Sequence, residues 1–459
     1  MAVTPSAMAD NAAKSPDSPA ADAVTIVDRG TYFDVVFALE KGATHRQLGE
    51  AYGEKLRLQV PEFEQQLDSY ISENCTNWLI HKVVMYRIRQ IKKQIPQDYR
   101  DEIEGIASKL SGGDHDERGD GKVSENELYL FNLLGDVARL YQCSAVGVYG
   151  NSSATGSPIV GRNFDWPDGK KAQLANLQAV LSIKNGTHSF ANVGCLGFQG
   201  AVSAFNNHGV FAAVLDSPTG AKYSPRHKRS YLLDLRQALE NCTTLDAVAD
   251  WMEDPEKHYA VNHIIMLADK NSAAVLENNI SGKTGSKGGG KSGGQKNKKS
   301  VPGHRQLRTT ASKLRDGVTW DIPDTVGCVN CFQLDGSDDN QVDPWDKKQA
   351  KKKPNQPVAQ ANLYRWQTMK TQLSARGPKL DRNAIKETMS YYHPESRGDM
   401  YKGDLYNVFT IQSMVFEPQS LHMEVAFRPR NGTMPARPAY EEIPIHVQPA
   451  QAEKLTESR

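Results

Sequence analysis

The chain has 459 residues, of which 39% are hydrophobic and 24% charged, and its formal net charge at pH 7 is +1. This is the composition of a globular protein that can build a substantial core in one large or two smaller domains. A net charge this close to zero argues against nucleic acid as the principal partner, and six cysteines are too few for a disulfide-dense scaffold.

Residues 1–26 are rich in Ala, Ser and Pro, and we expect them to form a disordered tail. They contain no apolar segment of the kind found in a secretory signal or a transmembrane helix, which favours a cytoplasmic location. A lysosomal or secreted location stays open because six N-x-S/T triplets occur in the chain, at Asn74, Asn151, Asn185, Asn241, Asn279 and Asn431.

Helical patterning dominates the N-terminal part of the chain after a first strand at residues 31–39. It runs through residues 44–95 up to Pro96, and a further helix is predicted for residues 98–110. We assign residues 27–142 as a helical N-terminal segment. Apolar side chains on its helices fit either packing in the core or one wall of an apolar pocket, and the examples are Val83, Val84, Tyr86, Ile88 and Ile91.

An acidic, glycine-rich segment in residues 114–127 partly matches a calcium-binding loop. Asp116, Asp120 and Glu127 fall at the first, fifth and twelfth positions, but Arg118 takes the third, where an oxygen ligand belongs. The alternative is a polar turn followed by a helix that opens with a capping box at Ser124. No other metal site and no cofactor are predicted.

The stretch from Gln142 to Trp166 carries the chemistry. Cys143 begins an alternating run that reads as a strand, and residues 159–164 read as the returning strand of a hairpin. Arg162 and Asp165 therefore arrive beside the strand that Cys143 starts. The alternative is that Cys143 is simply a buried apolar residue and that Arg162 and Asp165 form a structural ion pair.

A base for the Cys143 thiol is not obvious, because no histidine lies in this stretch. Cleavage of the chain between Gln142 and Cys143 would supply one, since the released α-amino group titrates near pH 8 and belongs to the nucleophile's own residue. Asp165 would then hold the amine, and Arg162 would favour the thiolate.

The arrangement C-x-n-G-R-N-F-D-W resembles the cysteine N-terminal-nucleophile hydrolases that act on linear amides. This group includes acid ceramidase, N-acylethanolamine amidase, choloylglycine hydrolase, penicillin V acylase and isopenicillin N acyltransferase. The resemblance implies an α+β fold, a four-layer αββα sandwich, and a zymogen whose helical prosegment (27–142) is separated by self-cleavage from the catalytic domain (143–459). It also implies that Cys143, Arg162 and Asp165 are catalytic.

Downstream, alternating apolar runs predict antiparallel strands, and two helices precede a further hairpin. The predicted strands cover residues 175–184, 190–193, 201–205, 210–215, 261–268, 273–277, 326–332, 405–416 and 421–427, and the helices cover 231–241, 245–252 and 362–373. Residues 281–303 are rich in Gly, Lys and Ser and should form a disordered loop. That loop and the lysine-rich residues 347–353 fit peripheral contact with anionic lipid or simple solvation.

Two further site residues follow from the resemblance. Asn330 in V-N-C-F is similar to the asparagine that supplies an oxyanion-hole amide, and the alternative is an Asn that closes a strand. Arg365 in N-L-Y-R-W falls where a second active-site arginine often occurs, and the alternative is an exposed helix arginine. At Asp216 the chain departs from the bile-salt and penicillin enzymes, which would show Asn.

Three hypotheses for the function follow. The first is an amidase that cleaves a small-molecule N-acyl amine, preferably a fatty-acyl amide, through a cysteine thioester. The second is an acyltransferase that passes the same thioester to another amine. The third is a catalytically inactive scaffold or calcium-binding protein that keeps the fold.

Overall fold

The structure is a computed structural model of the chain. It describes residues 23–38, 43–75, 77–113, 118–137, 143–185, 188–217, 223–280, 304–335, 358–396 and 398–447. The loop expected at residues 281–303 and the lysine-rich residues 347–353 lie outside this part of the chain. Within it, no helix is long and apolar enough to cross a membrane.

The N-terminal segment begins with two paired strands, β1 (Val24–Asp28) and β2 (Phe33–Ala38). The tail was expected to extend to residue 26, but β1 already begins at Val24, because β2 supplies it with an antiparallel partner. The helices that follow are α1 (His45–Gln59), α2 (Phe63–Asn74), α3 (Trp78–Lys92), α4 (Gln97–Ala107), α5 (Glu125–Asn132) and α6 (Leu134–Val137).

The helical pattern predicted for residues 44–95 is divided among three helices. Thr44 and Gln47 form a capping box at the start of α1, and the helix ends just before Pro61, which cannot donate a backbone hydrogen bond. The Asn77 side chain accepts from the Leu79 backbone N–H at 2.8 Å and so starts α3.

A nine-stranded sheet holds most of the strands, in the order β1-β2-β5-β6-β7-β8-β9-β10-β11. Its neighbours pair antiparallel except β2 and β5, which are parallel. The strands after β2 are β5 (Gln178–Asn185), β6 (His188–Cys195), β7 (Ser203–Asn206), β8 (Phe211–Asp216), β9 (His263–Ala268), β10 (Ala273–Asn279) and β11 (His304–Arg308).

A six-stranded antiparallel sheet with the order β12-β3-β4-β13-β14-β15 carries the cysteine hairpin. Its strands are β3 (Ser144–Val148), β4 (Ile159–Asp165), β12 (Thr325–Val329), β13 (Thr410–Glu417), β14 (His422–Phe427) and β15 (Glu441–Glu442). The predicted hairpin is confirmed, because β3 pairs with β4 in the register Ala145↔Arg162.

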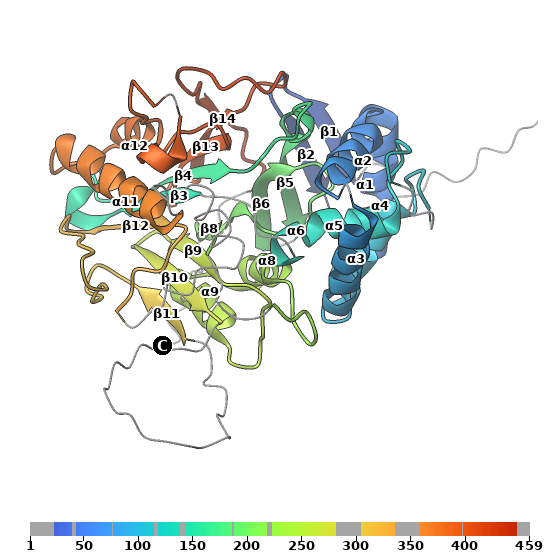
Figure 1. The fold of residues 1–459 in the computed structure, drawn as a ribbon, viewed down its shortest axis with the longest axis horizontal. Helices are drawn as coiled ribbons and strands as arrows, with labels where there is room; N and C mark the ends of the chain where they lie inside the picture. The colour runs from blue at the N-terminus through green and yellow to red at the C-terminus, as the bar shows by residue number, and fades with distance from the viewer. Residues whose placement is uncertain are drawn as a thin grey trace, which may run out of the picture.

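Three clusters of buried apolar side chains show how these sheets and helices are layered. One lies between the N-terminal helices, α8 (Tyr231–Asn241), α9 (Leu245–Glu253) and the nine-stranded sheet. A second lies between the two sheets, and a third between the six-stranded sheet and α11 (Val358–Ala375) and α12 (Arg382–Met389). The expected mixture of helices and sheets is thus found (Figure 1).

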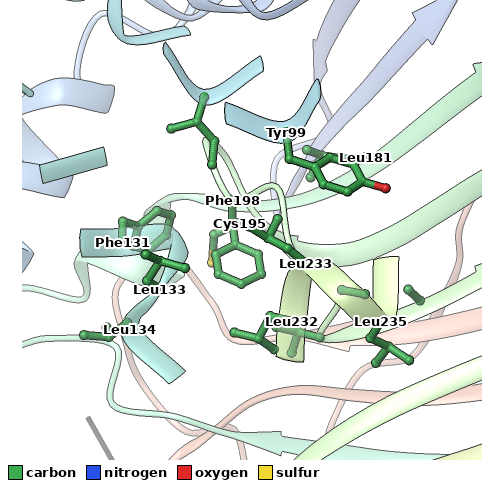
Figure 2. Packing of buried hydrophobic residues seen from close by; sticks show 14 of the residues in the cluster. Tyr99, Phe131, Leu133, Leu134, Leu181, Cys195, Phe198, Leu232, Leu233 and Leu235 are labelled. Carbon is green, nitrogen blue, oxygen red and sulfur yellow. The ribbon is translucent and has the colours of Figure 1, made fainter. Parts of the chain in front are cut away.

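The helix–sheet cluster matters most for the site. Figure 2 shows Tyr99 of α4, Phe131 of α5, Leu181 of β5, Cys195 of β6 and Leu232 of α8 meeting there. The N-terminal helices therefore pack directly on the sheet that faces Cys143, and they belong to the same core. The sequence patterns did not predict β1, β11, β15, α12 or the short helix α7 (Gln173–Asn176), which takes the first residues of the strand predicted at 175–184.

Candidate active site

Cys143 lies directly before β3 and is buried, with 5% of its surface exposed. Its Sγ is 3.9 Å from Nη2 of Arg162 on β4 and 3.9 Å from the backbone oxygen of Asp165. The hairpin therefore brings Cys143 beside the Arg162 side chain and the Asp165 backbone, whereas the Asp165 carboxylate contacts Arg365, Asn407 and Thr410. Burial raises the pKa of the Cys143 thiol, and the Arg162 charge only partly offsets this, so the resting sulfur is protonated.

Arg162 is fully buried between the two sheets. Its Nε donates to the Ser203 hydroxyl on β7 at 2.6 Å, and its guanidinium carbon lies 5.2 Å from the centre of the Phe164 ring. Nη1 is buried and has no hydrogen-bond partner among the described residues. A buried cation with an unused donor is costly in a purely structural role, so this arrangement fits a site that stabilises negative charge.

Asp165 is also fully buried, but it is held from the other side of the sheet. Its carboxylate accepts from the Thr410 hydroxyl at 2.7 Å and from Nδ2 of Asn407 at 2.7 Å, and it lies 3.3 Å from Nη2 of Arg365. Burial raises the pKa of Asp165 to about 6 against the lowering effect of Arg365 and the hydrogen bonds. The carboxylate is therefore mainly ionised at neutral pH.

Arg365 is fully buried on α11, so the alternative of an exposed helix arginine is wrong. Burial lowers the pKa of its guanidinium, although the neighbouring Asp165 raises it. The ion pair joins α11 to the end of β4 and links the outer helices to the cysteine hairpin.

Asn330 follows β12 and is 3% exposed. Its Nδ2 donates to the backbone oxygen of Asp216 at 2.7 Å, and its own backbone oxygen accepts from Asn362 at 2.9 Å. Asp216 and Cys143 line the same cavity, so the hydrogen bond to Asp216 holds Asn330 beside the wall of that cavity.

An apolar cavity opens beside Cys143. It lies between the helices α5, α6 and α8 and the nine-stranded sheet, within the region shown in Figure 2. The residues that line it are Phe131, Leu134, Gly135, Cys143, Phe164, Trp166, Leu174, Gly194, Cys195, Phe198, Val202, Val214, Asp216, Tyr231 and Leu232. Most of them are aromatic or aliphatic, which suits an apolar ligand group.

The N-terminal segment contributes to this wall through α5 and α6, and not through the helix that the sequence analysis emphasised. Ile88 and Ile91 of α3 are buried in the helix–sheet core, whereas Val83 and Tyr86 are both 44% exposed. The apolar face of α3 thus does not reach the cavity.

The structure describes two of the three calcium candidates. Asp116 is outside the described residues, and Asp120 accepts from the Lys122 backbone N–H at 2.9 Å. Glu127 accepts from both the backbone and the hydroxyl of Ser124 at 2.8 Å, which is the capping box of the alternative interpretation. In the described ranges, no group of three or more His, Cys, Asp or Glu side chains is arranged to hold a metal ion.

Sequence reasoning missed three residues that position the charged groups: Ser203, Asn407 and Thr410. They come from elements distant in the chain from Arg162 and Asp165. Single hydroxyl and amide residues on strands carry no periodic pattern, so only the paired register of β4 with β13 could have identified Thr410.

Comparison with known proteins gives only distant structural likenesses. No family model matches the sequence, and no curated protein matches it. Among solved structures, an N-acylethanolamine-hydrolyzing acid amidase ortholog from Caenorhabditis elegans is 15% identical, with 60% of this chain and 93% of that chain covered and a TM-score of 0.35.

Two bacterial structures give similar values. A variant of conjugated bile acid hydrolase from Clostridium perfringens is 10% identical, with 68% and 100% of the two chains covered and a TM-score of 0.35. Penicillin V acylase from Agrobacterium tumefaciens is 11% identical, with 62% and 83% covered and a TM-score of 0.34. Because these TM-scores are low, the function proposed below rests on the site itself.

Proposed function

We propose that this protein is a cysteine amidohydrolase of the N-terminal-nucleophile type, with an αββα sandwich, and that it cleaves the amide of an N-acyl amine. The position of Cys143 carries the proposal. Its thiol borders an apolar cavity and also lies beside the Arg162 guanidinium. An acyl chain in the cavity would present its carbonyl at the end beside the Arg162 guanidinium, which can stabilise negative charge.

The general base in this proposal is the α-amino group that cleavage before Cys143 would release. Gln142 lies outside the described residues, and so does the bond to be cut. Among the described residues, the hydrogen-bond contacts of Cys143 are with Arg162 and Asp165, and no histidine lines the cavity. An amine on the nucleophile's own residue supplies the missing base.

The reaction would proceed through a thioester. The amine takes the proton from Sγ, the sulfur attacks the amide carbon, and the carbonyl oxygen becomes an oxyanion. As the C–N bond breaks, the resulting ammonium group returns the proton to the leaving amine. The amine then takes a proton from water, which attacks the thioester, and the freed acid leaves the Cys143 thiol restored.

The polar and charged groups around Cys143 would have different roles. Arg162 favours the thiolate, and Nη1, which has no hydrogen-bond partner among the described residues, is suited to hold negative charge that forms beside the sulfur. Asp165 would neutralise the ammonium group of Cys143. Asn330 uses one N–H on the Asp216 carbonyl, so donation to the oxyanion would use its second N–H.

The mass of the purified protein tests the cleavage step. The 459-residue chain should yield chains of 142 and 317 residues, and Cys143→Ala should stay intact, because the thiol must attack the preceding carbonyl. A wild-type protein that stays a single chain at acidic and neutral pH, yet still hydrolyses amides, would falsify the amine mechanism.

A substrate panel tests the chemistry. The panel contains N-acyl ethanolamines, ceramides, glycocholate, penicillin V and N-acyl amino acids, and we expect cleavage of the long-chain acyl amides. Cys195→Ala is the matched control, since Cys195 is a buried thiol of the same cavity. It should keep activity, whereas Cys143→Ala loses it. Product that forms only with an added acceptor amine would identify an acyltransferase instead.

A further inference from the structure

Helix α3 exposes an unusual amount of apolar surface. In the described part of the chain nine large hydrophobic side chains are exposed, and five of them lie on this one helix. The exposed fractions are 62% for Trp78, 56% for Leu79, 51% for Ile80 and 44% for both Val83 and Tyr86. A cluster of this kind on one element marks an interaction surface.

The opposite face of α3 already supplies its share of the core. Met85, Ile88 and Ile91 are buried against the other N-terminal helices and the sheet. The exposed side chains are therefore not needed to hold α3 in place. Helix α3 lies at the periphery of the molecule (Figure 1), where a large partner can reach it.

The exposed face of α3 is basic as well as apolar. The segment from Trp78 to Lys93 contains no acidic residue. Lys82, Arg89 and Lys93 are exposed, and the Lys82 ammonium lies 4.5 Å from the centre of the Trp78 ring. Aromatic and aliphatic side chains interleaved with cations are the signature of a helix that lies in the interface of a lipid bilayer.

We propose that the exposed face of α3 docks the protein on an anionic phospholipid surface. A second copy of the chain fits the face less well, because a two-fold contact would bring the Lys82, Arg89 and Lys93 side chains of both copies together. Anionic headgroups supply the opposite charge, and the Trp78 ring suits the headgroup level of the bilayer.

The docking face is close to the proposed acyl cavity. Nη1 of Arg87 donates to the backbone oxygen of Val137 at 2.8 Å, so α3 is tied to α6. Leu134 and Gly135 of α6 line the cavity. If the proposed function holds, a docked protein meets amphiphilic substrates where they are stored, but the docking itself does not depend on Cys143 chemistry.

Sedimentation with lipid vesicles tests this surface. The Cys143→Ala protein is used alongside wild type, so that a failure of catalysis leaves the binding measurement unaffected. We expect binding to vesicles of 70% phosphatidylcholine and 30% phosphatidylglycerol, weaker binding to pure phosphatidylcholine, and a decrease with salt. Trp78→Ser with Leu79→Ser should weaken partitioning by about tenfold or more.

Charge variants and a matched apolar control separate the electrostatic and apolar contributions to vesicle binding. Lys82→Gln and Arg89→Gln should each weaken binding to the anionic vesicles roughly fivefold. Leu58→Ser removes an equally exposed side chain, 60% accessible, from α1, and it should leave binding unchanged. Circular dichroism confirms that each variant is folded.

Three outcomes overturn the proposal. The first is absence of vesicle binding, and the second is equal binding to neutral and anionic vesicles. The third is a stable dimer, measured by light scattering, that Trp78→Ser dissociates, because the face would then be covered by a second copy.

Discussion

Two buried arginine–carboxylate clusters in this protein are built in opposite ways. Arg236 and Glu102 are each 1% exposed and join two pairs of atoms at 2.8 and 2.9 Å. Arg236 also binds Glu240 at 2.8 Å, and Glu102 binds His45 at 3.0 Å. The Arg236–Glu102 and Glu102–His45 pairs link α8, α4 and α1, so this cluster works as a structural clamp between the three helices.

The Cys143 cluster is paired much less completely. Arg365 meets Asp165 at 3.3 Å, a longer contact than those in the Arg236 cluster, and in the described part of the chain the hydrogen-bond contacts of Arg162 are with a hydroxyl and a sulfur rather than with a carboxylate. Its Nη1 has no hydrogen-bond partner among the described residues. Two buried cations therefore accompany one buried carboxylate, an excess of positive charge that a substrate oxyanion or thiolate can use.

The pKa values of Glu102 and Asp165 reflect this difference in pairing. Burial favours the neutral form of both, but Arg236 and His45 outweigh it at Glu102, and the pKa of Glu102 is lowered. At Asp165 burial wins, and the pKa rises to about 6. Completely paired charges thus mark structure here, and incompletely paired ones mark the candidate site.

Neutralising the Asp165 and Glu102 carboxylates one at a time tests this comparison most directly. Asp165→Asn should reduce turnover per folded molecule by about 10³-fold or more, because the amine of Cys143 loses its counter-charge, and it should also destabilise the fold because Arg365 loses its buried carboxylate partner. Glu102→Gln should leave turnover per folded molecule intact but destabilise the fold by about 3 kcal/mol, because Arg236 loses a partner. Denaturant unfolding and steady-state kinetics measure both; exchanged phenotypes would contradict the assignment.

The next largest effect is expected at Arg162. Arg162→Gln removes the cation beside Sγ, so the pKa of the Cys143 thiol should rise further and its alkylation by iodoacetamide at pH 8 should slow by about tenfold. Mass spectrometry of the Cys143 peptide follows the reaction. Arg236→Gln is the control, because that arginine lies in the structural clamp, and an equal slowing there would point to general loosening of the fold.

How far the sequence predicts this site depends on the distance between the partners. Cys143, Arg162 and Asp165 lie in one hairpin, so the pairing of its two strands is enough to place them near one another. Arg365 was identified only through a family resemblance, since its partner Asp165 is 200 residues away in the chain. Hydroxyl and amide partners such as Thr410 could not be predicted, because only tertiary pairing selects them.

The secondary structure also divides into elements that local periodicity predicts and elements that depend on tertiary pairing. The helix Tyr231–Asn241 and the alternating strands were predictable because periodicity is local. The edge strands β11 and β15 are short or polar and gain their structure from a neighbouring strand. For helix α3 the core-packing alternative holds for Ile88 and Ile91, but the helix carries a second apolar face, and the sequence alone does not say which face enters the core.

The two clusters should also differ in their pH dependence, with changes of up to about tenfold per pH unit in the unfolding equilibrium or in activity. The folded pKa of Asp165 lies above that of an unfolded Asp, so its contribution to stability is fully present below about pH 4 and is lost as pH rises through about 6. Glu102 has a lowered pKa, so its contribution is present above the unfolded value and is lost in acid. Activity needs ionised Asp165 and should fall below pH 6.

The matured enzyme, assayed from pH 4 to 8 with its unfolding curve measured at each pH, checks this opposition. Activity that declines below pH 6 while the folded fraction stays complete supports a titrating site residue. A decline that follows unfolding instead would assign the acid limb to the clamp around Glu102.

The smallest predicted effect tests whether Arg162 is merely present or is held in position. Ser203→Ala removes the hydroxyl that accepts from Nε at 2.6 Å and leaves a buried donor unpaired, which should cost about 1–3 kcal/mol of stability. If that hydrogen bond orients the guanidinium toward Sγ, kcat should also fall severalfold while KM stays nearly constant, and thiol alkylation should slow in parallel. Ser203→Thr, which keeps the hydroxyl, should restore the alkylation rate. A stability loss with unchanged alkylation would mean that Arg162 keeps its place without Ser203.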